Sequence, residues 1–320
     1  MGNGTHHTNN DPRNEQIKIN INGELFARDE AKVSVFDSGF ILGDGVWEGL
    51  RLHQGKLPFV EQHIKRLYEG AKALDMEVGI APAALIERIL STCHANKMYD
   101  HVHIRLMVSR GVKSTPYQDP RVTITPATIV IIPEYKLPAT ESASKGLRLH
   151  TVYVRRGYPD VQDPKLNSHS KLNCIFGCIQ ATKAGADEGL MLDPHGFVAT
   201  CNSTHFFIVR NDEVWTSTGD YCLAGITRAN IINLCQEAGI PVHQKNFSLA
   251  EVYSADEAFV TGTFAGVIPV REVDGRAIGP FNPATGYGNL PAADQPFAKG
   301  PMVARLQALY HALIASEVPQ

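Results

Sequence analysis

The stretch from Val35 to Leu67 reads "VFDSGFILGDGVWEGLRLHQGKLPFVEQHIKRL". At its end, Val60, Ile64 and Leu67 start a helical spacing of apolar residues, which predicts an amphipathic helix over 60–74. Its glycines do not form a nucleotide loop, because "GDGVWEG" lacks the strand–turn–helix context of phosphate-binding glycine motifs. The stretch therefore predicts a helix from residue 60, and the role of the glycines before it has to be inferred from the rest of the chain.

Strand and helix patterns continue on both sides of this stretch. In 101–110, apolar residues alternate with others, which predicts a half-buried strand. Further strands are predicted at 17–21, 31–37, 128–135, 147–154, 188–193, 205–209 and 257–263. Further helices are predicted at 82–97, 172–185, 227–240 and 301–318, and a long Pro/Gly/Ala loop at 281–300. Because these elements follow no regular strand–helix–strand period, the predicted fold class is α+β.

Composition suggests where the chain divides. Residues 1–14 are polar and predict a flexible tail, in which His6 and His7 are expected to be inert. The Pro/Ser-rich segment 136–146 predicts a linker. We therefore expect an N-terminal domain over 15–135 and a C-terminal domain over 147–320.

Charge and cysteine content exclude several classes of function. The 320 residues are 43% hydrophobic and 20% charged, as in soluble globular proteins, and the net charge of −3 offers no basic surface for nucleic acid. No apolar run reaches the roughly 18 residues of a membrane helix, and the N-terminus has no apolar signal core. We expect a cytoplasmic protein with no nucleic-acid or membrane partner and no metal site. The cysteines are expected to be reduced and mostly buried: Cys93, Cys174, Cys178, Cys201, Cys222 and Cys235.

Two turns have the character of an anion site. In "AGITRAN" (224–230), Gly225 and Ile226 lie just ahead of a predicted helix, where free N–H groups and the helix dipole favour phosphate. In "VTGTFAG" (260–266), the Thr263 hydroxyl and nearby N–H groups follow an apolar strand. Taken singly, the first feature is more often simply a capped helix and the second an ordinary tight turn, and a lone helix arginine such as Arg66 is usually a solvated charge.

Several stretches together resemble one enzyme family. Residues 35–67 are similar to the N-terminal signature of the class IV, fold type IV, pyridoxal-phosphate-dependent aminotransferases, and the likeness continues through 183–209, 223–240, 254–275 and the last helix. That family includes branched-chain aminotransferases, D-amino-acid transaminases, aminodeoxychorismate lyases and R-selective amine transaminases. The resemblance implies a smaller N-terminal α/β domain, a larger C-terminal pseudo-barrel domain that binds pyridoxal 5'-phosphate, and a homodimer.

The resemblance also implies a phosphate site. In the family the arginine of the "H-x-x-R-L" helix binds the cofactor phosphate, and here it is Arg66. The "G-I-T-R" turn adds contacts from Ile226 and Thr227, and the "T-G-T-F" turn adds Thr263 and the Phe264 N–H. A dianionic phosphate suits a guanidinium combined with helix-start N–H donors.

The stretch "DPKLNSHSKLNC" (163–174) departs from the family at the covalent cofactor site. Many members read "D-P-R-I-K-S-L-N-Y-L-N", and this lysine forms a Schiff base with the cofactor. Aligned on Asp163-Pro164, the lysine becomes Asn167 and the tyrosine becomes Lys171. That tyrosine reaches the cofactor's 3-hydroxyl, beside the aldehyde carbon, so Lys171 is the predicted catalytic residue. The alternatives are Lys165, which needs a bulge in the chain, and a chain without a Schiff-base lysine.

A second departure lies at the pyridine nitrogen, where the family usually places a glutamate and this chain has Thr200. A carboxylate keeps that nitrogen protonated, and a hydroxyl does so less well. Asp193 or Glu188 could compensate, but both are expected to end their strand in solvent.

The resemblance places Trp47, His103 and Arg105 in a substrate pocket, with Leu42 where branched-chain enzymes have a tyrosine. The alternative for His103 and Arg105 is the exposed face of a strand. The D-amino-acid carboxylate motif "S-P-R-A-H" is absent. We therefore expect transamination between an L-amino acid or hydrophobic amine and a keto acid. An aminodeoxychorismate-lyase type of reaction and a degenerate cofactor-binding protein are the alternatives.

Overall fold

The structure is a computed structural model that describes residues 11–137, 145–288, 297 and 299–317. These residues form two compact units. We call residues 11–137 with Leu166–Lys171 the N-terminal unit, and the described residues of 145–165 and 172–316 the C-terminal unit. Leu166–Lys171 thus groups with residues 11–137, which precede the linker, and composition does not predict this grouping.

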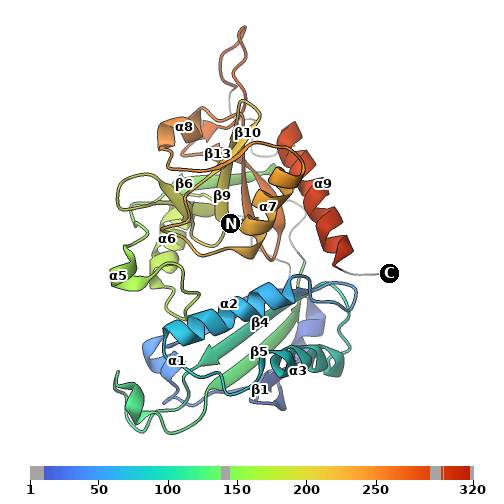
Figure 1. Ribbon diagram of the computed structural model, residues 1–320, viewed down its shortest axis with the longest axis vertical. Helices are drawn as coiled ribbons and strands as arrows, with labels where there is room; N and C mark the ends of the chain where they lie inside the picture. Colours follow the sequence, from blue (N-terminus) through green and yellow to red (C-terminus); the bar gives the residue numbers. More distant parts are fainter. Residues whose placement is uncertain (1–10, 138–144, 289–296, 298, 318–320) are drawn as a thin grey trace. The chain divides into compact units, whose positions relative to one another are not determined.

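The N-terminal unit is a sheet covered by helices on one face (Figure 1). Its strands pair antiparallel in the order β2-β1-β5-β4-β3. Helices α2 and α3 pack against this sheet and enclose a core of aliphatic side chains. The bounds are β1 Lys18–Ile21, β2 Glu24–Ala27, α1 Ser38–Leu42, β3 Gly45–Leu52, α2 Val60–Ala73, α3 Pro82–Ala95, β4 Val102–Ser109 and β5 Thr128–Tyr135, with short 3-10 helices at Pro12–Gln16 and Pro120–Val122.

Two predictions about this unit are wrong. The strand predicted at 31–37 is irregular chain, because an Asn22-Gly23 turn with positive φ at both residues (53° and 100°) returns β1 directly into β2. Val35 is 67% exposed, so no burial supports a further strand there. The predicted tail is also too long, since Pro12–Gln16 forms a 3-10 helix capped by Asp11. His6 and His7 lie outside the described residues.

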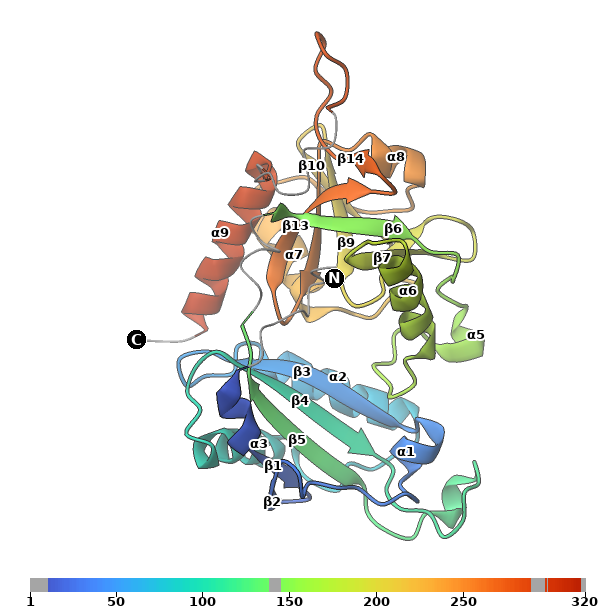
Figure 2. The same ribbon diagram turned by 180° about the vertical axis from the view of Figure 1, so that it is seen from behind.

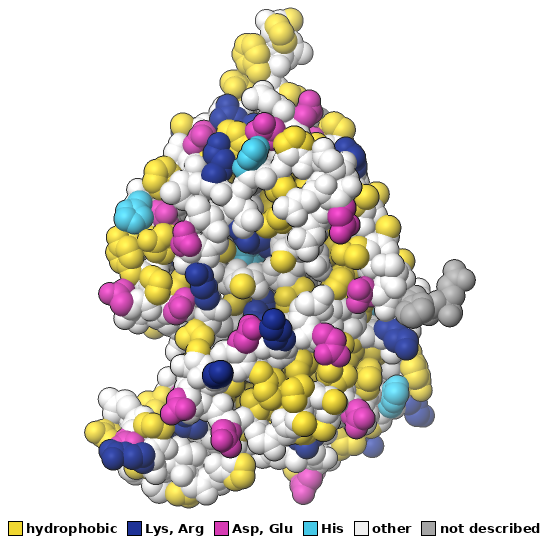
Figure 3. Space-filling view, in the orientation of Figure 1, with side chains coloured by type: hydrophobic (Ala, Val, Ile, Leu, Met, Phe, Trp, Pro, Cys, Tyr) yellow, Lys and Arg dark blue, Asp and Glu magenta, His cyan; other side chains and the backbone are white. Residues whose placement is uncertain are grey.

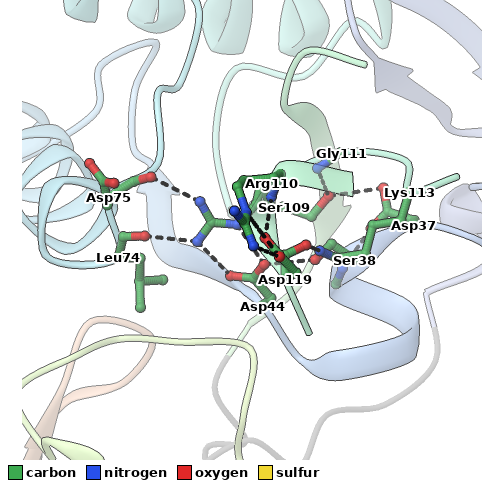
Figure 4. A network of polar contacts seen from close by, with 12 residues as sticks. Asp37, Ser38, Asp44, Leu74, Asp75, Ser109, Arg110, Gly111, Lys113 and Asp119 are labelled. Carbon is green, nitrogen blue, oxygen red and sulfur yellow. Dashed lines mark hydrogen bonds and ion pairs between the residues drawn. The ribbon is translucent and has the colours of Figure 1, made fainter. Parts of the chain in front are cut away.

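A polar network fixes the turn that leads into β3 (Figure 4). The Arg110 guanidinium donates to both carboxylate oxygens of Asp44 (2.7 and 3.1 Å) and to the carbonyls of Leu74 (2.7 Å) and Asp75 (2.9 Å). The Ser38 hydroxyl donates to the same carboxylate (2.7 Å). Burial raises the pKa of Asp44, but these hydrogen bonds outweigh it and hold the pKa below its usual value. The network therefore ties α1 and the start of β3 to β4 and the end of α2.

The C-terminal unit is built on a mixed sheet in the order β11-β10-β9-β12-β13-β6-β7-β8, with β14 beside β13. Helix α6 packs on β6 and β7, and α7 and α9 pack on each other and on β12. Figure 2 shows α6 beside β7, and α7 beside α9, from behind. The bounds are β6 Leu147–Thr151, α5 Pro159–Gln162, α6 Leu172–Lys183, β7 Glu188–Leu192, β8 Val198–Cys201, β9 His205–Arg210, β10 Glu213–Thr216, α7 Ile226–Glu237, β11 Val242–Gln244, α8 Leu249–Tyr253, β12 Glu257–Gly262, β13 Gly266–Val273, β14 Arg276–Ala277 and α9 Pro301–Ser316.

The predicted α+β class is confirmed, as are the helices predicted within 60–74, 82–97, 172–185, 227–240 and 301–318. All six cysteines are free, and four of them are buried, as predicted. Of the predicted linker and the loop at 281–300, residues 138–144, 289–296 and 298 lie outside the described part of the chain. Lys, Arg, Asp and Glu side chains are interspersed on the face that Figure 3 presents, without a field of one sign.

Candidate functional site

Segment Leu166–Lys171 adds to the free edge of β3. The Trp47 N–H donates to the Asn167 carbonyl (2.9 Å), and the His169 N–H donates to the Gly45 carbonyl (2.9 Å). Gly45 must be glycine here, because a Cβ would lie 2.5 Å from the Val108 carbonyl oxygen and 2.7 Å from the His169 ring. The segment is therefore held at this edge by backbone hydrogen bonds and by the absence of a side chain at position 45.

Lys171 and Trp47, both predicted site residues, meet at this edge. The half-buried Lys171 donates from Nζ to Asn167 Oδ1 (3.0 Å), and its Nζ lies 5.3 Å from the Trp47 ring centroid. Asn167, which stands where the family has its lysine, is only 7% exposed. Lys165 is exposed and belongs to the C-terminal unit. Thus, within the N-terminal unit, the Lys171 amine reaches the side chain at the family's lysine position.

Arg105 lies on the same sheet face as Trp47. Its guanidinium carbon is 4.0 Å from the Trp47 ring centroid, within range of a cation–π interaction. Burial lowers the pKa of Arg105, and the nearby Glu134 carboxylate partly opposes this effect. No carboxylate within the described residues forms an ion pair with Arg105, so its charge lacks a close partner there.

The other two predicted pocket residues have different surroundings. His103 is 6% exposed, so the alternative of an exposed strand face is wrong for it. The His103 ring lies beside Gly49, and Gly49 is paired with Arg105 across β3 and β4. His103 and Arg105 therefore lie on the same face of the sheet. Leu42 ends α1 and is 39% exposed.

Arg66 lies on the opposite, helix-covered side of β3. It donates from Nε (2.7 Å) and Nη2 (2.6 Å) to Glu48, which is completely buried. His63 Nδ1 also bonds to Glu48 (2.7 Å). Burial favours the neutral carboxyl, yet the hydrogen bonds from His63 and Arg66 prevail and lower the pKa of Glu48. Arg66 is thus oriented by a buried carboxylate and is not the freely solvated helix charge that the sequence allowed.

Sequence reasoning missed Glu48 and His63. A signal was available for Glu48, because it shares its strand face with Val46 and Leu50, both buried in the core. A carboxylate at such a position needs a cationic partner. Its partners, His63 and Arg66, lie in the first two turns of the next helix, at a spacing that sequence alone does not pair with Glu48.

In the C-terminal unit, the predicted anion turn is the start of α7. The helix begins at Ile226 after Gly225, and no side chain caps its N-terminus. Ile226, Thr227 and Arg228 are nevertheless at most 9% exposed. Arg228 donates to the Ser217 carbonyl (2.6 Å) but, within the described residues, forms no ion pair with a carboxylate. A buried helix start with uncapped N–H groups and a cation is suited to an anionic ligand.

The second predicted anion turn, Thr263 and Phe264, joins β12 to β13. Phe264 is buried and Thr263 half-buried. The hydroxyl of Thr261, at the end of β12, is fully buried and has no hydrogen-bond partner among the described residues. The turn therefore carries polar groups beside an apolar strand, as expected.

Thr200 lies on β8, within a buried hydroxyl and carboxyl network. Its hydroxyl donates to the Thr204 carbonyl (2.8 Å). Glu188 accepts from the Thr204 hydroxyl (2.8 Å) and from the Ser203 N–H (3.1 Å) and hydroxyl. Burial raises the pKa of Glu188 to about 7, against the lowering effect of these hydrogen bonds.

The expectation that Glu188 and Asp193 end their strand in solvent is wrong. Glu188 is 2% and Asp193 3% exposed. Asp193 is buried because it accepts the backbone N–H groups of His195 and Phe197 (2.9 Å each) and so closes the turn between β7 and β8. Glu188 is buried because all five residues of β7 are enclosed on both faces.

No helix within the described residues is long and apolar enough to cross a membrane. Among those residues, no cluster of histidine, cysteine or carboxylate side chains has the arrangement of a metal site.

Comparisons with known proteins agree with one another. A family model described as "Amino-transferase class IV" matches residues 45–273. The chain is 38% identical over 268 residues to branched-chain-amino-acid aminotransferase-like protein 2 of Arabidopsis thaliana, covering 84% of this chain but 48% of that protein. It thus spans about half the length of this plant relative. It is 40% identical over 264 residues to a putative branched-chain-amino-acid aminotransferase of Methanocaldococcus jannaschii, covering 82% and 90% of the two chains.

Solved structures of similar enzymes have the same fold. A T.th. branched-chain amino acid aminotransferase, complexed with N-(5'-phosphopyridoxyl)-L-glutamate, superposes with a TM-score of 0.82 at 29% identity. The match covers 95% of this chain and 96% of that chain. The branched-chain aminotransferase from Thermoproteus uzoniensis, solved with norvaline, superposes with a TM-score of 0.80 at 26% identity, covering 94% and 96% of the two chains.

Proposed function

The chain belongs to the class IV aminotransferases, and we propose that it is a pyridoxal-phosphate-dependent transaminase that moves an amino group from an amino acid or amine to a keto acid. The relatives' names favour a branched-chain amino acid as one substrate. The observation that carries the proposal is the 3.0 Å contact of Lys171 Nζ with Asn167 Oδ1, which puts an amine beside the family's lysine position.

The residues present fit this cofactor. An uncapped, buried helix start beside the buried Arg228 suits the phosphate, and we assign Ile226, Thr227, Thr263 and the Phe264 N–H to it. We assign Arg66 to the phosphate as well, with Glu48 orienting its guanidinium. We assign Lys171 to the covalent attachment of the cofactor.

Thr200 is assigned to the pyridine nitrogen. Its only hydroxyl proton is already donated to the Thr204 carbonyl, so its oxygen can only accept a further hydrogen bond. It therefore suits a nitrogen that carries a proton. Glu188 supports this arrangement, because it accepts a hydrogen bond from the Thr204 hydroxyl and so fixes Thr204. The Thr204 carbonyl in turn accepts the hydrogen bond from the Thr200 hydroxyl.

Pyridoxal phosphate, when bound, supplies an aldehyde that carries the amino group and a ring that withdraws electrons from the substrate. The chain's own part is binding, orientation and proton movement. When not attached to the cofactor, the Lys171 amine would accept the proton from the substrate α-carbon and deliver it to the carbon that was the cofactor's aldehyde, as transfer of the amino group requires. Trp47 and His103 line the pocket with Leu42, and the Arg105 guanidinium attracts the carboxylate of the keto acid.

We further propose a cytoplasmic homodimer. Leu172, Ile175, Phe176 and Ile179 recur at helical spacing along α6 and are 44–61% exposed in the single chain. A contiguous apolar stripe of this kind is typical of a surface that a partner covers. Sedimentation of the full chain tests this assignment.

An absorbance experiment tests the function. The full chain loaded with pyridoxal phosphate should absorb at roughly 410–420 nm, as expected for a lysine-bound aldehyde, lose the band with an amino donor and regain it with a keto acid. Lys171→Ala should abolish the band, and Lys165→Ala is the matched control that should keep it. A band that responds to no donor would favour the cofactor-binding protein that Asn167 and Thr200 suggest. A band that recovers without a keto acid, with release of pyruvate, would favour the lyase.

A further inference from the structure

We infer that Asn167 is a positioning residue that holds the ε-amine of Lys171 in place, an inference that rests on the proposed role of Lys171. Asn167 is more than the vacated position of a family lysine. It lies between the β3 backbone and the Lys171 side chain, and its amide contacts both.

The orientation of the Asn167 amide is determined by Trp47. Asn167 Nδ2 donates to the Trp47 carbonyl (2.6 Å), while the Trp47 N–H donates to the Asn167 carbonyl (2.9 Å). An amide group that donates from Nδ2 on one side must present Oδ1 on the other. Asn167 is 7% exposed, so water does not compete freely for these contacts.

The oxygen of this fixed amide is the group that Lys171 contacts. Lys171 Nζ donates to Asn167 Oδ1 (3.0 Å) across a separation of four residues that leads into the first turn of α6. A free lysine side chain samples many rotamers, and a fixed acceptor restricts the amine to one region. The same segment also fixes the ring beside the amine, because Trp47 Nε1 donates to the Ser168 carbonyl (3.1 Å).

The chemistry predicts a measurable consequence. A fixed acceptor stabilises the ammonium form more than the neutral amine. His169, which interacts electrostatically with Lys171, and Arg105, which shares the Trp47 ring, also face this amine and are unchanged in the variants below. Differences among the variants therefore report Asn167.

The test measures the pH midpoint for acylation of Lys171 in the full chain without added cofactor, by trace labelling and peptide mapping. Asn167→Leu, similar in size but without an acceptor, should lower the midpoint by about one unit and so raise labelling about 10-fold at a fixed pH below it. Asn167→Asp keeps an acceptor oxygen and should restore the midpoint to the parent value or above. Asn20→Leu is the matched control, since Asn20 is similarly buried and its Oδ1 accepts the Gly23 N–H (2.9 Å).

An unchanged midpoint in Asn167→Leu, or the same downward shift in Asn167→Asp, would overturn the inference. A shift in Asn20→Leu equal to that in Asn167→Leu would also overturn it, since the effect would then be structural. Because the measurement needs no cofactor, its failure is distinguishable from failure of the proposed function, which the absorbance experiment reports separately.

Discussion

Replacing Glu48 by Gln should unfold the N-terminal unit at markedly lower denaturant. Three hydrogen bonds of 2.6–2.7 Å converge on the buried carboxylate, two from Arg66 and one from His63. Glutamine keeps one acceptor oxygen but turns an N–H group toward donors. Removing one partner of a buried ion pair costs about 3–5 kcal/mol. Because the Arg66 side chain is 14% exposed and can regain some water, we expect the lower limit, about 3 kcal/mol.

The two tryptophans make the measurement specific. Trp47 lies in the N-terminal unit and Trp215 in the C-terminal unit, so in a Trp215→Phe background tryptophan fluorescence reports urea unfolding of the N-terminal unit alone. Glu69→Gln is the matched control, on helix α2 with Arg66 and His63, because Glu69 forms an exposed pair with Lys65 (3.8 Å) that should contribute less than about 1 kcal/mol. A loss below about 1 kcal/mol in Glu48→Gln would show that the buried pair does not hold α2 on β3.

Acidity adds an independent check on Glu48. Its pKa is lowered in the folded state, so the stability it contributes is present above the usual carboxyl pKa and is lost as pH falls through the folded value. Glu48→Gln should therefore flatten the decline of stability in acid. A decline that matches the parent chain would mean that other carboxylates cause it.

Three further expectations concern Glu188, Gly45 and Arg105. The folded pKa of Glu188, about 7, exceeds the unfolded value of 4.5, so this group stabilises the fold at low pH and the stabilisation is lost as pH rises to 7. The free energy of unfolding in urea should therefore fall by about 3 kcal/mol across that range in the parent chain, and this fall should be absent in Glu188→Gln. Gly45→Ala should lower the stability reported by Trp47 fluorescence by at least about 2 kcal/mol, whereas Gly49→Ala, which would meet only a side chain at 3.3 Å, should cost less. Arg105→Gln removes the charge assigned to the keto-acid carboxylate, so steady-state kinetics should show KM for the keto acid raised about 10- to 100-fold with little change in kcat. A fall in kcat with KM unchanged would contradict this assignment.

Periodic spacing of apolar residues correctly predicted the helices and strands that bury one face. The spacing of Ile64, Leu67 and Ala71 predicted α2, and the alternation in 101–110 predicted β4, because each pattern reflects burial of one face. The strand predicted at 31–37 is absent, because the turn at Asn22-Gly23 pairs β1 with the nearer segment β2. Propensity alone does not reveal which partner a strand finds.

The site shows the same limit. The sequence separated Lys171 from Lys165 by alignment, but the Asn167 contact depends on Trp47, 120 residues away, and no spacing rule connects them. The hydrogen bonds that satisfy the buried Glu188 likewise come from the hydroxyl groups of Ser203 and Thr204, beyond the next strand. Sequence reasoning placed Glu188 in solvent, because its hydrogen-bond partners lie far away in the sequence.

The identity of the cofactor-bearing lysine can be read out chemically. The full chain loaded with pyridoxal phosphate would be reduced with borohydride, digested and sequenced by tandem mass spectrometry. We predict that the pyridoxyl group is found on Lys171 and that Lys165 is unmodified. A pyridoxyl group on Lys165 or any other lysine, or none at all, is incompatible with a cofactor held at position 171.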